Sequence, residues 1–170
     1  MITFCAKSRP LLCVLVVLLC LYGLVVYLQS IGFGLSYQGS KSMPEGWYVT
    51  YPLHKIKRGD TVVFYPPQSA EQIMLQQHWI EPGAVMMKQV YGMPGDKVCH
   101  WNHALYINHH RIGPVLREYK PGHFLPNLSF CRDLSHNEYM LMSTHIVRSF
   151  DSRYFGPISR DHIIAKAQKL

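Results

Sequence analysis

The longest apolar run in the chain lies near its N-terminus and places the strongest limit on how the chain can fold. Residues 11–28 form an uncharged run of eighteen residues, and Lys7 and Arg9 come just before it. A helix rises about 1.5 Å per residue, so this run matches the ~30 Å hydrocarbon thickness of a bilayer. No further Lys or Arg occurs until Lys41, and basic flanks favour the cytoplasmic side. The sequence therefore predicts a single membrane anchor with a cytoplasmic N-terminus.

A cleaved secretory signal and a lipoprotein signal are the alternatives to an anchor. A secretory signal has an apolar core of about 7–15 residues and a small-residue cleavage site, whereas residues 30–34 read Ser-Ile-Gly-Phe-Gly. A lipoprotein at Cys20 would need a small residue where Leu19 stands. An uncleaved anchor over residues 1–30 is favoured, followed by a catalytic domain over residues 31–170.

The net charge of +7 arises without any compact block of Lys and Arg, which suits contact with anionic lipid better than reading of nucleic acid. No phosphate loop, paired Cys-x-x-Cys or zinc-finger spacing is present. The roughly 140 residues after the anchor are enough for one hydrophobic core. Membrane lipid is therefore an expected partner, and nucleic acid is not.

The exported part is expected to form a mainly β domain, because short β-prone segments alternate with Gly, Pro and Asn turns. One short helix is expected over residues 71–79, with Ser69 and Gln72 as its capping box. Residues 116–135 and 143–156 are expected to be loops. The expected strands are 61–65, 84–91, 97–101, 104–108, 109–115, 138–142 and 162–167.

Two of the five cysteines, Cys99 and Cys131, lie in the exported part. An oxidising compartment favours a disulfide between them; the alternative is two separate buried thiols. The other three lie in or before the apolar run and are expected to act as small hydrophobic residues.

Two stretches carry residues suited to nucleophilic catalysis. Ser42 lies in a turn bounded by Gly39 and Pro44, and Lys88 lies in a strand among apolar residues. A serine hydroxyl needs a base, and a lysine supplies one when burial lowers its pKa. Alone, each residue has an ordinary explanation: a turn serine and a solvent-facing edge lysine. Together they predict a nucleophile and its base, with Ser40 placed to help stabilise an oxyanion.

Three ordered stretches carry a family resemblance. Ser40-x-Ser42-Met-Pro, then Lys88-Gln-Val-Tyr-Gly-Met-Pro-Gly-Asp, then Ser149-Phe-Asp-Ser-Arg-Tyr-Phe-Gly-Pro resemble the motif set of bacterial type I signal peptidases, which are Ser/Lys-dyad serine endopeptidases. The short chain, single anchor, cysteine pair and Met-Pro-x-Gly-x-Tyr segment resemble the TraF-type pilin-processing branch of conjugative transfer systems.

The resemblance implies a mostly antiparallel β domain with a hydrophobic surface that rests on the membrane beside the site. It implies no cofactor and no metal. It assigns Ser42 as nucleophile, Lys88 as general base and later acid, Ser40 as oxyanion donor, Ser149 as the residue that hydrogen-bonds the lysine amine, and Asp151 and Arg153 as a supporting ion pair.

The chain departs from the ordinary secretory enzymes at two positions. Gln89 stands where they usually have Arg, and Thr144 stands where they usually have Asp. Because both members of that pair are absent together, the departure favours a dedicated peptidase over a housekeeping one.

The histidines suggest two other hypotheses, a metal site and a Ser/His/Asp catalytic triad. A His-x-x-His spacing among residues 100–110 could hold a metal, but these residues surround an expected hairpin tip without a carboxylate. A Ser/His/Asp triad with Ser42 and Asp151 is the second alternative, and nothing in the sequence selects its histidine.

The expected function is cleavage of leader peptides from exported preproteins, with small side chains one and three positions before the cleaved bond. A conjugative prepilin is the favoured substrate, and capture of the acyl-enzyme by an amine would cyclise it. The alternatives are a general signal peptidase and a non-catalytic anchored component of a transfer apparatus. The protein is expected to lie in the bacterial inner membrane, with its catalytic domain in the periplasm. Other components of the transfer system are expected partners.

Overall fold

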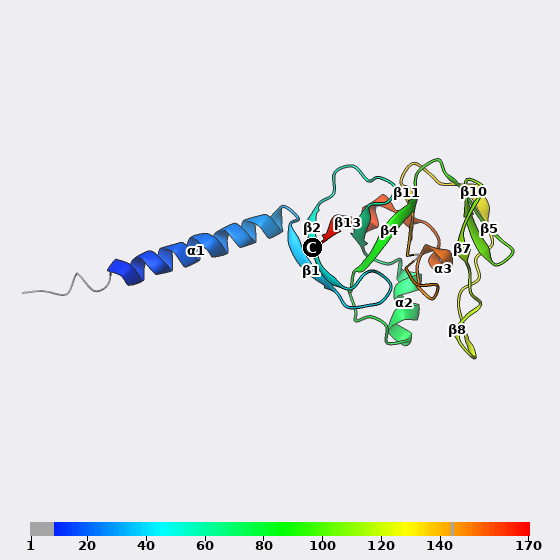
Figure 1. The fold of residues 1–170 in the computed structure, drawn as a ribbon, viewed down its shortest axis with the longest axis horizontal. Coiled ribbons are helices and arrows are strands. Elements are labelled where there is room, and N and C mark those ends of the chain that lie inside the picture. The colour runs from blue at the N-terminus through cyan, green and yellow to red at the C-terminus, as the bar shows by residue number, and fades with distance from the viewer. Residues whose placement is uncertain (1–8, 144) are drawn as a thin grey trace, which may run out of the picture.

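The computed structural model describes residues 9–143 and 145–170, which form one long helix and a β-rich body. Helix α1 spans Arg9–Ser30 and projects away from the body (Figure 1). The most apolar 18-residue window within Pro10–Ser30 has a mean hydropathy of 3.0, and none of that window is buried. The helix predicted over the apolar run is therefore confirmed, and its length and composition are sufficient to cross a membrane.

A seven-stranded antiparallel sheet forms the centre of the body. Its strand order is β1-β2-β13-β3-β4-β11-β12. Strand β4 lies inside this sheet, between β3 and β11, and Lys88 pairs with Val62 of β3. The bounds are β1 Gly34–Gln38, β2 Gly46–Pro52, β3 Thr61–Phe64, β4 Met86–Gly92, β11 Glu138–Met142, β12 Ile158–Ser159 and β13 Ile163–Lys169.

A second sheet of four strands, ordered β10-β5-β6-β7, lies at the end of the body far from α1 (Figure 1). Both of its hairpin turns have two residues with positive φ, as type I′ turns require. Cys99 and Cys131 face each other across β5 and β10 and form a disulfide. The bounds are β5 Lys97–Trp101, β6 Ala104–Ile107, β7 His110–Pro114 and β10 Cys131–Asp133, with a separate hairpin of β8 Glu118–Lys120 and β9 His123–Phe124.

The mainly β architecture is as predicted, and the helices need correction. Helix α2 spans Gln68–Gln76, and its first turn is closed by a hydrogen bond from the Glu71 amide to the Pro67 carbonyl. The capping box predicted at Ser69 is wrong, because that residue already lies inside the helix. The expected loop 143–156 contains α3, Ser152–Phe155, and a short 3-10 turn, η1, spans Arg160–His162.

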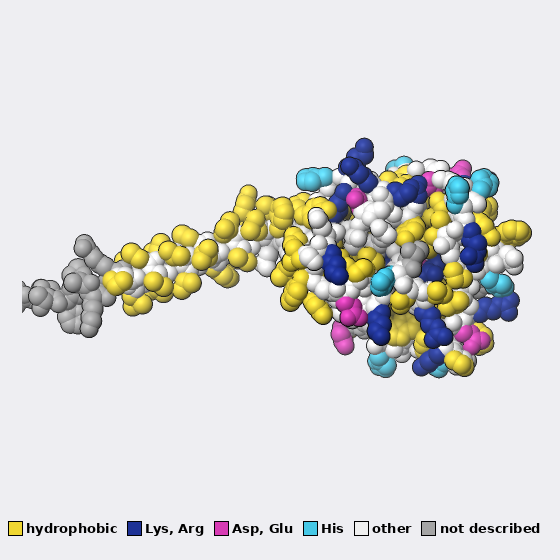
Figure 2. Space-filling view, viewed as in Figure 1, with side chains coloured by type: hydrophobic (Ala, Val, Ile, Leu, Met, Phe, Trp, Pro, Cys, Tyr) yellow, Lys and Arg dark blue, Asp and Glu magenta, His cyan; other side chains and the backbone are white. Residues whose placement is uncertain are grey.

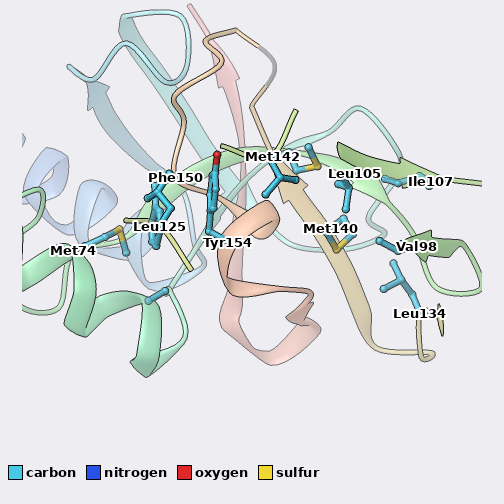
Figure 3. Close-up of a cluster of buried hydrophobic side chains, with 12 residues drawn as sticks. Met74, Val98, Leu105, Ile107, Leu125, Leu134, Met140, Met142, Phe150 and Tyr154 are labelled. Atoms are coloured by element: carbon cyan, nitrogen blue, oxygen red, sulfur yellow. The ribbon is translucent and has the colours of Figure 1, made fainter. Parts of the chain in front are cut away.

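A continuous apolar core joins α2, the main sheet and the four-stranded sheet. Figure 3 shows Met74, Leu125, Phe150 and Tyr154 on the side of α2, and Met140 and Met142 extend this cluster toward the second sheet. A neighbouring cluster packs around β3 and β4. Gly92 allows β4 to approach β11 closely, because a Cβ at that position would lie 2.8 Å from the Met140 side chain. Four of the seven β4 residues, Met87, Lys88, Val90 and Gly92, are buried.

Candidate active site

Ser42 lies in the turn between β1 and β2, and neighbouring residues hold this turn in place. Met43 is buried, and the Tyr48 hydroxyl donates a 2.8 Å hydrogen bond to the carbonyl of Pro44. Gly46 begins β2 with φ of 138°, a conformation that favours glycine. These contacts leave Ser42 partly exposed at the edge of a cavity.

Lys88 reaches Ser42 from β4 although the two residues are 46 positions apart. Its Nζ lies 2.8 Å from Ser42 Oγ, and its side chain is only 3% exposed. Burial lowers the pKa of Lys88 from 10.5 to about 8, because an apolar surrounding penalises the ammonium. The negative charge of Asp151 opposes this change, and the positive charge of Arg153 adds to it. A substantial neutral fraction is therefore present near neutral pH.

A second hydroxyl contacts Ser42 from the same turn. Ser40 Oγ lies 2.9 Å from Ser42 Oγ, and either hydroxyl can donate. The Gln38 amide nitrogen donates to Ser40 Oγ at 2.6 Å and to the Ser40 carbonyl at 3.0 Å. Because an amide nitrogen only donates, the Ser40 hydroxyl keeps its own hydrogen and is able to donate it. Sequence reasoning missed Gln38, since nothing in the sequence marked the strand that carries it.

Ser149 lies on the wall of the same cavity as Lys88. It is 2% exposed, and its Oγ has no hydrogen-bond partner among the described residues. The expected hydrogen bond between Ser149 and the lysine amine is therefore not formed in this structure, in which the amine is directed at Ser42 Oγ instead.

Asp151 and Arg153 form a two-pronged ion pair in the interior. Arg153 Nε lies 2.8 Å from Asp151 Oδ1, and Arg153 Nη2 lies 2.9 Å from Asp151 Oδ2. The Arg153 side chain is 2% exposed and the Asp151 side chain is 0% exposed. The guanidinium also donates to the carbonyls of Pro114, Ser143, Val147 and Ser149. One buried arginine thus holds much of the segment that follows β11.

Ser143 connects this ion pair to Ser42, and sequence reasoning missed it. Its backbone amide donates to Asp151 Oδ2 at 3.1 Å, and its carbonyl accepts from Arg153 Nη2 at 3.2 Å. Its own hydroxyl donates to the Ser42 carbonyl. A small polar residue at the end of a hydrophobic strand gives no signal in a single sequence that would single it out.

Four of the site residues, Ser40, Ser42, Lys88 and Ser149, line a cavity of about 710 Å³. The rest of its wall is mostly apolar. The cavity can therefore hold an extended apolar segment directly against the Ser42 hydroxyl.

The histidines of residues 100–110 and Gln89 are not among the residues that line this cavity. His100 is partly buried, its Nδ1 lies 3.0 Å from the Leu128 carbonyl, and its ring stacks on Phe130. Among the described residues, no group of three or more His, Cys, Asp or Glu could hold a metal ion. The Gln89 amide donates to the Gly59 carbonyl at 2.9 Å, and Thr144 lies outside the described residues.

Comparison with known proteins gives relatives of one kind. The family model described as signal peptidase, peptidase S26, matches residues 8–170. Plasmid transfer protein TraF of Escherichia coli is 32% identical over 73% of this chain and 75% of its own length. Signal peptidase I of Bacillus caldolyticus is 25% identical over 69% of this chain, which spans 63% of that protein. A signal peptidase I structure from Enterococcus faecalis V583 has a TM-score of 0.40 and 20% identity, over 67% of this chain and 97% of that one.

The family model covers nearly the whole chain, including the Ser42 turn, the Lys88 strand and the Asp151–Arg153 segment. The resemblance first read from the three motifs is therefore confirmed. The chain belongs to the signal peptidase family, peptidase S26, and its relatives include a TraF plasmid transfer protein as well as a signal peptidase I.

Proposed function

We propose that the protein is a membrane-anchored serine endopeptidase in which Ser42 and Lys88 form the catalytic dyad. The observation that supports this most is the 2.8 Å contact between Ser42 Oγ and a buried lysine amine at the wall of an apolar cavity. A neutral amine at this distance accepts the serine proton as Oγ attacks the scissile carbonyl. The resulting ammonium then gives that proton to the departing amine.

Neighbouring groups serve the same reaction. The Ser40 hydroxyl and the Ser42 backbone N–H are placed to stabilise the oxyanion of the tetrahedral intermediate, and a single such donor contributes roughly 10²–10³ in rate. The acyl-enzyme that remains on Ser42 is released by water, or by an amine that forms a new peptide bond. Ser149 lines the same cavity, and in this proposal its hydroxyl receives the lysine amine when the amine leaves Ser42.

The anchor and the exposed surface beside it support a place at the periplasmic face of the inner membrane. Leu35, Tyr37 and Trp47 on β1 and β2 are 61%, 59% and 52% exposed, close to where α1 enters the body (Figure 1). Tyr and Trp are favoured at the boundary between lipid and water. This surface would rest on the bilayer and place the cavity near a membrane-embedded leader peptide.

The proposed substrate is the precursor of a conjugative pilin, which the relationship to a plasmid transfer protein supports. The test incubates the full-length protein in nanodiscs with a pilin precursor from a conjugative transfer system, and measures product masses. Cleavage of this precursor in preference to unrelated preproteins is expected, and a product lighter by one water than the linear fragment would reveal cyclisation. Equal cleavage of unrelated preproteins would indicate a general signal peptidase. A complete lack of cleavage would favour a non-catalytic component of the transfer apparatus.

The rate of cleavage is expected to rise with pH and to level off near pH 8. Only the neutral Lys88 amine accepts a proton, and its pKa is about 8, so kcat/KM should increase about tenfold per pH unit well below that value. An unperturbed lysine would place the inflection above pH 10 instead. Initial rates between pH 6 and pH 10, with the fold checked by circular dichroism, make the measurement.

Ser143→Ala is expected to lower kcat on the order of tenfold with little change in KM, because small displacements of a reacting group are costly. The substitution removes the hydroxyl that holds the Ser42 carbonyl, and Ser143 is not itself one of the residues that line the cavity. Ser129→Ala, which removes an exposed hydroxyl, is the matched control. An unchanged kcat in Ser143→Ala would show that the hydrogen bond to Ser42 does not position the nucleophile.

A further inference from the structure

The described wall of the active-site cavity carries several cations. Lys41 comes from the Ser42 turn, Lys120 from β8 and Arg148 from the segment after β11, and all three are exposed. Among the residues that the structure describes, no Asp or Glu lines the cavity. The salt bridges in the described part of the chain involve other cations, namely Arg58, Arg132, Arg153 and Lys166. Three separate segments therefore bring unpaired positive charges to one concave surface.

The segment that carries Lys120 is fixed to the body as a wall of the cavity. Trp79, just after α2, packs edge-on against the rings of Tyr119 and Phe150, with centroids 4.8 and 5.4 Å apart. The Tyr119 hydroxyl donates to the side chain of Gln77, and the Lys120 amine lies 5.3 Å from the Tyr119 ring. These aromatic contacts give the cavity an apolar floor and keep the Lys120 cation at its rim.

Figure 2 shows Lys and Arg side chains on both sides of an exposed hydrophobic area of the body. A peptide that enters such an area loses water, and charge interactions strengthen as water is excluded. A carboxylate on the peptide would gain from the cations, whereas a lysine or arginine would be repelled.

We infer that the cavity selects substrates with a carboxylate close to the scissile bond. The inference rests on the proposed function, since it assigns a chemical class to the peptide cut by Ser42. The carboxylate belongs to an Asp or Glu side chain or to the free C-terminus of a short leaving segment. Lipid phosphate is the less fitting partner, because these cations line a concave cavity, whereas the exposed aromatic surface suited to lipid lies on β1 and β2.

The test uses the full-length protein in nanodiscs of uncharged phosphatidylcholine. Internally quenched peptides carry Ala one and three positions before the cleaved bond and differ only by Asp, Asn or Lys at one flanking position. At the preferred position, kcat/KM for the Asp peptide is expected to exceed that for the Asn peptide about fivefold, as a few partly exposed charge pairs would give, and the Lys peptide is expected to be cleaved least. Salt should reduce the difference. Free and amidated C-termini distinguish a terminal from a side-chain carboxylate.

A triple variant, Lys41→Gln, Lys120→Gln and Arg148→Gln, should bring the Asp-to-Asn ratio close to one. The matched control, Lys55→Gln, Lys97→Gln and Arg111→Gln, removes the same charge from exposed positions outside the cavity wall and should keep the ratio. Equal cleavage of Asp and Asn peptides at every position would overturn the inference. So would a dependence on the three cations that appears only when the nanodiscs contain phosphatidylglycerol.

Binding separates this inference from the proposed function. The Ser42→Ala protein should bind the Asp peptide about fivefold more tightly than the Asn peptide in fluorescence anisotropy, even if the wild type cleaves neither peptide. Absence of cleavage with a clear Asp preference would reject the peptidase and keep the carboxylate site. Cleavage without any Asp preference in either assay would support the peptidase and reject the carboxylate site.

Discussion

Replacing Lys88 with methionine is expected to lower the rate of peptide cleavage by about 10²–10⁴-fold, the usual contribution of a general base, while making the folded protein more stable. Methionine matches the lysine stem in length and suits a side chain that is 3% exposed. A pKa lowered from 10.5 to about 8 corresponds to a cost of about 3 kcal/mol for keeping the ammonium buried. The hydrogen bond to Ser42 offsets about 1 kcal/mol of this cost. The free energy of unfolding should therefore be about 2 kcal/mol higher in the variant.

This pairing of lost activity with gained stability is specific to a buried catalytic lysine. The sign follows from linkage: the folded pKa lies below the unfolded one, so wild-type stability should rise as pH increases from about 8 to about 10.5. The Lys88→Met protein should lack this rise. Thermal melts across that range, together with initial rates, make the measurement.

Ser42→Ala and the double variant complete the test of Lys88. If the two residues act as one unit, the double variant should be no slower than either single variant. Lys97→Met, which removes an exposed strand lysine outside the cavity, is the control and should keep wild-type rates. Activity retained in Lys88→Met would contradict the dyad.

The interior strands could be predicted from the sequence because their residues are buried and β-prone. Val62, Val63 and Phe64 of β3 are almost fully buried and are preceded by a Gly-Asp turn signal. Strand β1 is different, because none of its residues is buried and its apolar Leu35 and Tyr37 face outward. Because β1 is an exposed edge strand whose apolar residues face outward, it has no inward-facing hydrophobic pattern that would predict a strand. The sequence therefore predicts neither β1 nor its partner β2.

The chemistry of the two residues and the family motifs predict that Ser42 meets Lys88, but the expected order of strands does not. Strands β13 and β3 separate β2 from β4 in the sheet, and the turn that carries Ser42 nevertheless reaches Lys88. Neither propensity nor spacing predicts such a contact. Gln38 and Ser143 support Ser42 through this same arrangement, which explains why the sequence alone did not reveal them.

Arg153→Met is expected to lower the free energy of unfolding by about 3–5 kcal/mol, because it leaves the Asp151 carboxylate buried without its partner. The Asp151 side chain is 0% exposed, and four backbone carbonyls lose the guanidinium as a donor. The matched control is Arg132→Met. It breaks the ion pair with Glu138 at the surface, where the arginine is 44% exposed, and should cost less than about 1 kcal/mol.

Two measurements would identify the unpaired charge as the cause. The double variant Asp151→Asn, Arg153→Met removes the carboxylate charge together with its partner, so it should recover much of the lost stability. A double variant as unstable as Arg153→Met would indicate lost packing instead. Arg153 also helps to lower the pKa of Lys88, so any activity that remains should show its inflection at a higher pH than in the wild type. An unmoved inflection would show that the ion pair supports the fold of the site without influencing its base.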